Sequence, residues 1–281
     1  MNFQFRDYFR VSNTKFMYLC RIKMLLMKKS PIGILCAMQE EVADILKCIE
    51  NAVQTEIGCR TYYKGTICDQ EVVVVFSRWG KVGAATTTTM LIDHFKVSEI
   101  IFVGTAGALN AELNVGDIVI GKQFLQHDFN CAPILKPYEL PFINRRFLEA
   151  ADIQIQKAEI AVSSFLQSNN FTQSFSQEQR ELFHLQNPKY KVGQIASGDS
   201  FFSTDKQKQE LLEKFPSLLC VEMEGAAVAQ VCYEYEIPLT VIRVISDSAN
   251  DNATIDFNKF IKEVAANYSK QIVLNLLNPT I

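Results

Sequence analysis

The sequence predicts a single α/β domain, a three-layer sandwich with helices on both faces of a central mixed β-sheet. Apolar runs typical of strands buried on both faces recur along the chain, for example at Ile32–Met38 and Leu239–Ile245. Segments with helical spacing alternate with these runs, which is the pattern of an α/β fold. No repeat, linker or change of composition divides the chain after Ser30. We therefore expect one domain over residues 31–281.

Residues 1–30 are expected to form an N-terminal extension. Their longest apolar run, Met24–Met27, is too short for the apolar core of a signal peptide. The first strand pattern begins only after Pro31, and both Met24 and Met27 are possible translation starts. We interpret the segment as an upstream translation artefact, and the alternative is a short tail or targeting arm.

Composition excludes several classes of partner. The 281 residues are 48% hydrophobic with a formal net charge of −3, which allows one large core and gives no reason to expect nucleic acid. No apolar run approaches the roughly 18 residues of a membrane span. None of the eight cysteines forms a C-x-x-C pair and several lie in apolar runs, as expected of reduced, buried thiols in a cytoplasmic protein.

The N-terminal half should contain a strand, a helix, a β-hairpin, a helix of small residues and a second buried strand. These elements cover Ile32–Met38, Val42–Cys48, Thr61–Ser77, Gly80–Met90 and Glu99–Val103. Gly104–Gly107 follows the last of them and indicates a turn whose glycines let backbone N–H groups approach a ligand.

The C-terminal half should begin with a strand from Val115 toward Asp128 and a long irregular loop at 130–142, where Pro133, Pro137 and Pro141 lie. A helix, a polar surface segment and alternating strands and helices should follow, at 144–166, 172–189, 192–196, 205–215, 218–221, 228–235 and 239–247. The last helix should start at Asp256 as N-cap and carry the apolar stripe Phe257, Phe260, Ile261, Val264, Tyr268 and Ile272.

Several predicted strands end in a short polar group. These groups are Glu40–Glu41, Gly104–Gly107, Ser197–Asp199, Glu222–Glu224 and Ser246–Asp247. Ligands of open α/β sheets bind at such strand ends, so the groups predict the rim of one pocket. Carboxylates beside an apolar strand are costly unless something uses them. For Glu222 and Glu224 alone, the alternative of solvated acids near a helix start is equally acceptable.

The pattern of polar residues favours acid–base chemistry without a cofactor. His94, His127 and His184 are scattered without metal-ligand spacing, and no nucleophile elbow or dinucleotide fingerprint occurs, so we expect neither metal nor cofactor. Carboxylates without a metal or a nucleophilic serine predict proton transfer around a water, as in the hydrolysis of a glycosidic bond.

Seven short motifs recur in a characteristic order along the chain. They are Ile32–Glu41, Gly80–Val82, Gly104–Gly107, Val115–Asp117, Ser197–Phe201, Val221–Ala227 and Ile245–Asp247. Together they resemble one known family, the 5′-methylthioadenosine/S-adenosylhomocysteine nucleosidases of the nucleoside phosphorylase superfamily, from Ile32 to about Leu277. The resemblance implies a nucleoside phosphorylase-like fold, a homodimer, and hydrolysis of an adenine thionucleoside to adenine and a 5-thioribose product in methionine salvage and S-adenosylmethionine recycling.

The resemblance implies two catalytic residues. Glu41 would activate the water that attacks C1′ of the ribose, and Asp247 would protonate N7 of adenine. Burial at a strand end should raise the pKa of Asp247 enough for it to hold that proton. The implied substrate-binding residues are Met38, Thr105, Ala106, Gly107, Phe201, Phe202, Glu222, Met223, Glu224, Arg243, Ser246 and Phe257.

Particular tasks follow for some of these residues. Glu224 would bind the ribose 2′- and 3′-hydroxyls, Phe201 would stack on adenine, and Phe257 would lie near the 5′ end. Glu222 is expected to pair with Arg243 more than to touch the ligand. Their neighbours have simpler interpretations: Glu40 is expected to be solvated or structural, and His127–Asp128 to be a structural pair or part of a subunit contact.

Three alternatives stay open. A purine nucleoside phosphorylase needs donors around a phosphate, which the negative charge of Glu40 and Glu41 would repel. A futalosine-type nucleoside hydrolase on the same fold is the second. A nucleoside sensor without turnover is the third, and the intact Glu41, Glu224 and Asp247 argue against it. The preferred 5′ substituent is left open because the loop at 130–142, which in this family shapes the partner's 5′ pocket, departs from the family pattern.

Overall fold

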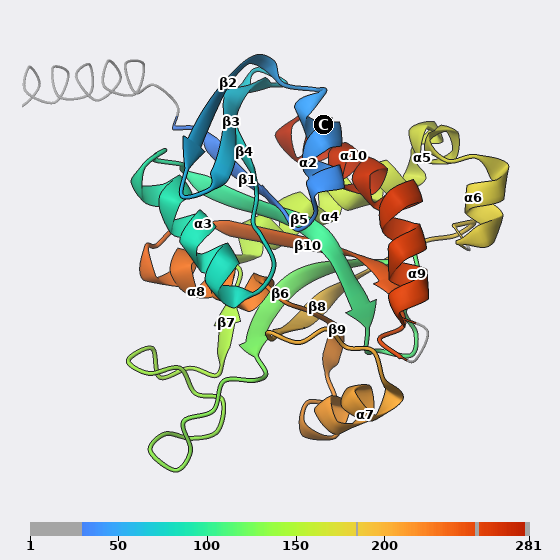
Figure 1. The fold of residues 1–281 in the computed structure, drawn as a ribbon. Helices are drawn as coiled ribbons and strands as arrows, with labels where there is room; N and C mark the ends of the chain where they lie inside the picture. Colours follow the sequence, from blue (N-terminus) through green and yellow to red (C-terminus); the bar gives the residue numbers. More distant parts are fainter. Residues whose placement is uncertain (1–29, 184, 251–252, 279–281) are drawn as a thin grey trace, which may run out of the picture. The chain divides into compact units, whose positions relative to one another are not determined.

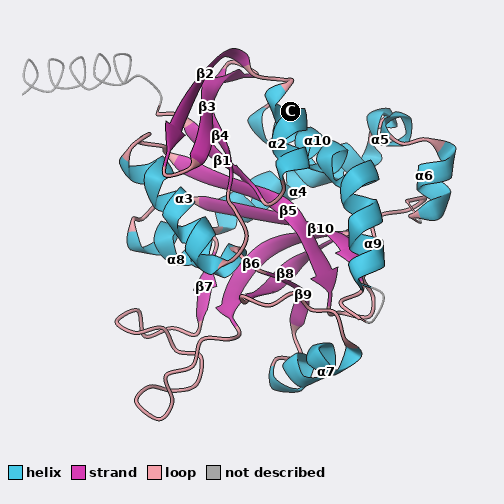
Figure 2. Ribbon diagram, in the orientation of Figure 1, coloured by secondary structure: helices cyan, strands magenta, loops and turns pink. Residues whose placement is uncertain are grey.

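The computed structural model describes residues 30–183, 185–250 and 253–278, so the interpretation of the leader at residues 1–29 lies outside the described residues. Residues 31–281 form one compact unit, in which helices cover both faces of a mixed sheet (Figures 1 and 2). The predicted α/β class with a central mixed sheet is confirmed. No helix within the described ranges is long and apolar enough to cross a membrane.

Ten strands form the sheet within the described residues. Their bounds are β1 Ile32–Cys36, β2 Glu50–Ile57, β3 Arg60–Ile67, β4 Gln70–Phe76, β5 Glu99–Ala108, β6 Ile118–Gln126, β7 Phe147–Glu149, β8 Tyr190–Ser197, β9 Leu218–Glu222 and β10 Leu239–Asp247. The helices are α2 Gln39–Leu46, α3 Lys81–Asp93, α4 Asp152–Gln167, α5 Asn169–Ser174, α6 Gln177–Leu182, α7 Asp205–Lys214, α8 Gly225–Glu234, α9 Ala253–Phe260 and α10 Ala266–Leu277, with a π-helical turn at Ile261–Ala265 between the last two.

The sheet has a closed part and an open part. Strands β5, β10, β6, β8 and β9 pair in turn, and β9 returns to β5, so these five strands form a ring. Strands β1, β4, β3 and β2 extend from β5 as an open sheet. Because β1, β5, β10, β8 and β9 include parallel neighbours, several carboxyl strand ends meet on one side of the sheet.

Alternation along the strands produces the three layers. Ile34 and Cys36 of β1 pack in the core beneath α2, α4 and α10, whereas Leu35 packs on the opposite face beneath α3 and α8. The same alternation sorts the valines of β4 between the two cores. Both faces of β1 and of Val72–Val75 in β4 are therefore buried, which confirms the prediction of a doubly buried strand for β1.

Four expectations about elements were wrong. The Gly104–Gly107 segment is no turn, because β5 continues to Ala108 while β10 and β9 pair with it. Residues 147–149 of the predicted helix form strand β7, and helix α4 begins at Asp152. The polar segment at 172–189 buries Phe175, Phe183 and Leu185. Helix α9 begins at Ala253, so Asp256 lies inside it.

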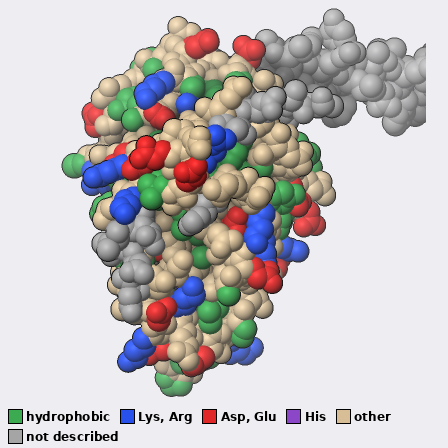
Figure 3. Space-filling view, turned by 90° about the vertical axis from the view of Figure 1, so that its right-hand side faces the viewer, with side chains coloured by type: hydrophobic (Ala, Val, Ile, Leu, Met, Phe, Trp, Pro, Cys, Tyr) green, Lys and Arg blue, Asp and Glu red, His purple; other side chains and the backbone are tan. Residues whose placement is uncertain are grey.

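The surface agrees with the near-neutral charge. On the face shown in Figure 3, acidic and basic side chains of the described residues are interspersed.

The cysteines agree only in part with the prediction of buried thiols. All seven in the described residues are free, and Cys36, Cys220 and Cys232 are buried, but Cys59 and Cys68 are exposed.

Candidate active site

A cavity of about 300 Å³ lies at the carboxyl ends of β1, β8, β9 and β10. Strand β5 and helix α9 complete its wall. This is the position at which open α/β sheets bind ligands, as the polar strand endings predicted. The lining residues are Ala37, Met38, Trp79, Thr105, Ala106, Gly107, Ser200, Phe201, Phe202, Val221, Glu222, Met223, Glu224, Ser246, Asp247 and Phe257.

Asp247 reaches this wall through a β-bulge. The register between β10 and β5 shifts between Ile245 and Asp247, which leaves Ser246 as the extra residue. Asp247 is 2% exposed, and its Oδ2 accepts a hydrogen bond of 2.8 Å from the Ser246 hydroxyl. Its Oδ1 accepts one of 2.8 Å from the Ala249 N–H. Both carboxyl oxygens are therefore held in place.

Gly107 makes room for this carboxyl group. A Cβ atom at position 107 would lie 2.8 Å from Asp247 Oδ1 and 2.9 Å from the Ala249 Cβ. Such contacts are too short for non-bonded atoms, so any larger residue at 107 would displace Asp247 or its loop.

Glu222 and Arg243 form a buried ion pair beside the cavity. The Arg243 Nη2 lies 2.8 Å from Glu222 Oε2, and the guanidinium carbon lies 4.0 Å from the centre of the Phe102 ring. Glu222 also accepts hydrogen bonds from Ser197 and from the backbone N–H groups of Glu224 and Gly225 at the start of α8. A negative charge is favourable at a helix N-terminus. The predicted pairing of Glu222 with Arg243 is confirmed.

Glu224 is the second buried acid on the cavity wall. It is 5% exposed, and its Oε1 accepts a hydrogen bond of 2.8 Å from the N–H of Gly80, the residue before α3. Burial and the neighbouring Glu222 carboxylate raise the pKa of Glu224. The hydrogen bond between Gly80 and Glu224 thus connects the start of α3 with the segment between β9 and α8.

Glu41 lies behind the wall. It is fully buried, its Oε1 accepts a hydrogen bond of 2.8 Å from Ser269 of α10, and its Oε2 accepts one of 3.0 Å from the N–H of Met38. Burial raises the pKa of Glu41 to about 7, although both hydrogen bonds and the Arg243 charge oppose the shift. Met38 itself lines the cavity, whereas Glu41 does not.

Aromatic side chains form the apolar part of the wall. The Phe201 ring stands edge-on to Phe257 with 5.6 Å between centroids, and Phe202 packs against His127 at 5.2 Å. Asp128, the neighbour of His127, instead accepts hydrogen bonds from Lys81 Nζ and the Asp199 N–H. His127 and Asp128 therefore contact different residues, and their place in a subunit contact stays a prediction.

Comparison with known proteins decides the family. The model of the phosphorylase superfamily matches residues 31–278. A 5′-methylthioadenosine/S-adenosylhomocysteine nucleosidase of Staphylococcus aureus is 35% identical over 242 residues, which cover 86% of this chain and 96% of that protein. The chain belongs to this nucleosidase family.

Two solved structures extend the comparison. A Streptococcus pneumoniae nucleosidase in complex with 8-aminoadenine has a TM-score of 0.76 and 32% identity, and the match covers 89% of this chain and 100% of that one. A futalosine hydrolase of Helicobacter pylori has a TM-score of 0.76 and 30% identity, with 90% and 99% covered. Both have the fold of the nucleosidase family over nearly their whole length.

The structure brings most residues predicted from the nucleosidase resemblance to one cavity. All except Glu41 and Arg243 line it, and those two lie directly behind Met38 and Glu222. Glu40 is exposed, in line with its solvated interpretation. Asp199 does not line the cavity but accepts a hydrogen bond from the Lys81 N–H at the start of α3.

Sequence reasoning missed two residues that bear on the site. Trp79 lines the cavity from the segment between β4 and α3, where a strand end followed by Gly80 could have indicated it. Ser269 interrupts the apolar stripe of the last helix one residue after Tyr268 and is fully buried. A buried polar residue in such a stripe implies a partner, which here is Glu41.

Proposed function

We propose that this protein hydrolyses the N-glycosidic bond of 5′-methylthioadenosine and S-adenosylhomocysteine and releases adenine and the 5-thioribose product. The observation that supports this most strongly is the pair of buried acids, Asp247 and Glu224, on the wall of one largely apolar cavity in a member of the nucleosidase family. The activity serves methionine salvage and S-adenosylmethionine recycling.

Asp247 acts on the leaving group. Bond cleavage places negative charge on adenine, and a proton from Asp247 to N7 neutralises it. The hydrogen bonds from Ser246 and Ala249 fix the carboxyl group before the substrate binds, so little reorganisation is needed. Phe201, half-exposed at the cavity mouth, stacks on the purine.

The ribose lies between Met223 and Glu224. Glu224 accepts hydrogen bonds from the 2′- and 3′-hydroxyls, and the carboxylates of Glu222 and Glu224 favour the positive charge that develops on the sugar. Arg243 does not touch the substrate in this scheme. It holds Glu222, which in turn holds the backbone of Glu224.

Glu41 activates the water that attacks C1′. With a pKa of about 7 it is poised to accept a proton near neutral pH. Its carboxyl group accepts a hydrogen bond from the N–H of Met38, which lines the cavity, and we place the attacking water beside Met38. Hydrogen bonds of catalytic groups commonly tighten only once the substrate is bound.

A nucleoside panel tests the proposed function. Adenine release from 5′-methylthioadenosine, S-adenosylhomocysteine and adenosine is followed in phosphate-free buffer, and free base is followed from a futalosine-type nucleoside, which the Helicobacter pylori structure makes the second candidate. We expect rapid release from the two thionucleosides without phosphate. Strict dependence on phosphate would replace hydrolysis by phosphorolysis, and binding without release would indicate a sensor.

We further propose that the protein works as a homodimer in the cytoplasm. Ile134 and Phe142, in the segment at 130–142, are 87% and 101% exposed. In this proposal these side chains belong to the contact with a second copy, which is the partner expected in this family. The exposed thiols of Cys59 and Cys68 suit a reducing compartment.

A further inference from the structure

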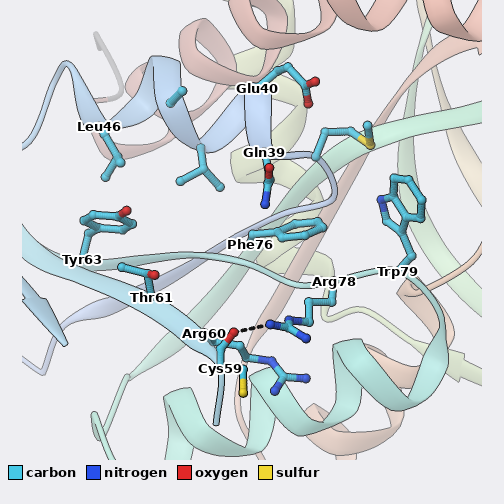
Figure 4. A pocket seen from close by; sticks show the side chains of 13 residues that line it. Gln39, Glu40, Leu46, Cys59, Arg60, Thr61, Tyr63, Phe76, Arg78 and Trp79 are labelled. Carbon is cyan, nitrogen blue, oxygen red and sulfur yellow. Dashed lines mark hydrogen bonds between the residues drawn. The ribbon is translucent and has the colours of Figure 1, made fainter. Parts of the chain in front are cut away.

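Two basic side chains near the site hold backbone carbonyl groups in place. Arg78 donates to the Cys59 carbonyl oxygen in the turn between β2 and β3, on the wall of a second cavity of about 650 Å³ (Figure 4). Lys208 of α7 does the same beside the proposed catalytic acid. Its Nζ donates hydrogen bonds of 2.8 Å to the carbonyl oxygens of Ala108 and Ser248.

The two carbonyl groups that bind Lys208 belong to the segments that hold Asp247. Ala108 ends β5 and follows Gly107, the residue that pairs with Asp247 at the end of β10. Ser248 follows Asp247 directly. The Lys208 ammonium group thus connects the end of β5 with the first residue after β10.

The position of the loop after β10 matters because the pairing of β10 with β5 ends at Asp247. Ala249 donates the hydrogen bond to Asp247 Oδ1, and its φ of 49° is uncommon for a residue other than glycine. Ala249 is fully buried in the same apolar cluster as Leu211 of α7. Lys208 and Leu211 are three residues apart, so one face of α7 carries both the ammonium group and the apolar contact.

Lys208 is half-buried, and its charge lies near two acids. Burial lowers the pKa of its amine, and the carboxylates of Asp205 and Asp247 oppose this shift. Asp205 begins α7 itself, whereas Asp247 faces Lys208 from β10. The positive charge therefore favours the carboxylate form of Asp247, which makes this acid a better proton donor. Further charged groups at or beside the cavity are Glu222, Glu224 and Arg243.

We propose that Lys208 is a positioning residue for the acid that protonates the base. Its hydrogen bonds hold the loop at 248–250, so that the Ala249 N–H fixes the Asp247 carboxyl group, and its charge favours transfer of the Asp247 proton. Lys208 does not line the nucleoside cavity, so it acts through Asp247. This inference rests on the proposed function, in which Asp247 donates a proton to adenine.

Replacing Lys208 by methionine removes both hydrogen bonds and the charge with a side chain of similar length. Adenine release from 5′-methylthioadenosine is measured between pH 5 and pH 9. Lys208→Met should lower kcat about tenfold and change KM by less than about twofold, because the residues that contact the nucleoside are unaltered. The alkaline limb of the kcat/KM profile, where the general acid loses its proton, should move up by about half a pH unit.

Two variants serve as controls. Lys208→Arg keeps a positive charge and several N–H donors, so its alkaline limb should stay at the pH found for the unaltered protein. Lys206→Met lies on the same helix at a side chain that is 85% exposed, and it should change neither kcat nor the profile. The pH of the limb does not depend on how much of a variant is folded, so partial unfolding cannot imitate the shift.

A double variant tests whether Lys208 acts through Asp247. In an Asp247→Asn background, Lys208→Met should lower the residual rate by less than about twofold, because the group that Lys208 positions is already lost. A full tenfold loss in that background would overturn the inference. So would an unmoved alkaline limb in Lys208→Met, the same shift in Lys208→Arg, or the same effects in Lys206→Met.

Each of these results would leave the nucleosidase function standing. Failure of the unaltered protein to release adenine from 5′-methylthioadenosine or S-adenosylhomocysteine would instead refute the proposed function.

Discussion

At the scale of single residues, the site consists of buried acidic side chains that hydrogen bonds hold in place. Asp247, Glu222 and Glu224 each accept hydrogen bonds from fixed donors, and Arg243 offsets part of their charge. Burying such groups costs free energy unless they are paired. In the proposed mechanism the cost is retained because each acid acts where charge develops during cleavage of the glycosidic bond.

Glu41 gives a prediction about pH. Its pKa in the folded protein, about 7, lies above the ordinary 4.5. The stability it contributes is therefore fully present below about pH 4.5 and is lost as the pH rises through about 7. Glu41→Gln stays neutral, so its free energy of unfolding relative to the unaltered protein should rise between pH 5 and pH 8, by roughly 2–3 kcal/mol.

Urea unfolding at the two pH values measures this difference. Glu40→Gln is the control, because Glu40 is the adjacent acid and is exposed. If the free energies of unfolding of the unaltered protein and of Glu41→Gln changed in parallel with pH, Glu41 would have the same pKa in the folded and unfolded chain. That result would contradict the prediction.

At the scale of elements, the end of β10 and the middle of β5 form one unit. The bulge at Ser246 and the absence of a side chain at Gly107 together set the position of Asp247. Gly107→Ala should therefore reduce kcat/KM by about 10²-fold, because a displacement of about 1 Å at a catalytic group has an effect of that size.

Gly33→Ala is the matched control for a glycine replaced within the sheet. The three atoms nearest to a Cβ at position 33 belong to the side chains of Ile100, Leu91 and Val97, and the nearest is the end of the flexible Ile100 side chain, which can shift. Equal losses of activity in both variants, in proportion to their loss of stability, would indicate general damage to the sheet and no special role of Gly107.

Elements with a strong local pattern were predictable. The runs at β1, β9 and β10 are mostly apolar and fully or almost fully buried, and their positions agree with the sequence to within two residues. Strand β2 was missed because it is mostly exposed and carries no apolar alternation. The continuation of β5 through Gly104–Gly107 was missed because β9 and β10, which are distant in sequence, supply its pairing.

At the scale of the whole domain, the site depends on the pairing of β9 with β5, which closes the ring of five strands. No local sequence pattern predicts this pairing. The residues of the cavity come from strand ends spread between Ala37 and Asp247. The motifs identified most of them in advance. The position of Glu41 behind Met38 and the contribution of Trp79 depend on long-range packing, so only the structure revealed them.

The proposed dimer is also tested at this scale. Analytical ultracentrifugation should give about twice the chain mass of 31.9 kDa. A double variant, Ile134→Ser with Phe142→Ser, removes the two most exposed apolar side chains of the segment at 130–142 and should shift the distribution toward monomer. A monomer of the unaltered protein at micromolar concentration would refute the proposal.

The central claim is that acids from separate strand ends act on one nucleoside, with Asp247 donating the proton to the base. The most direct measurement is the rate of adenine release from 5′-methylthioadenosine by Asp247→Asn, with its fold checked by circular dichroism. An amide cannot donate that proton as a carboxylic acid does, so the rate should fall by about 10²–10⁴-fold. A rate within twofold of the unaltered protein would contradict the account.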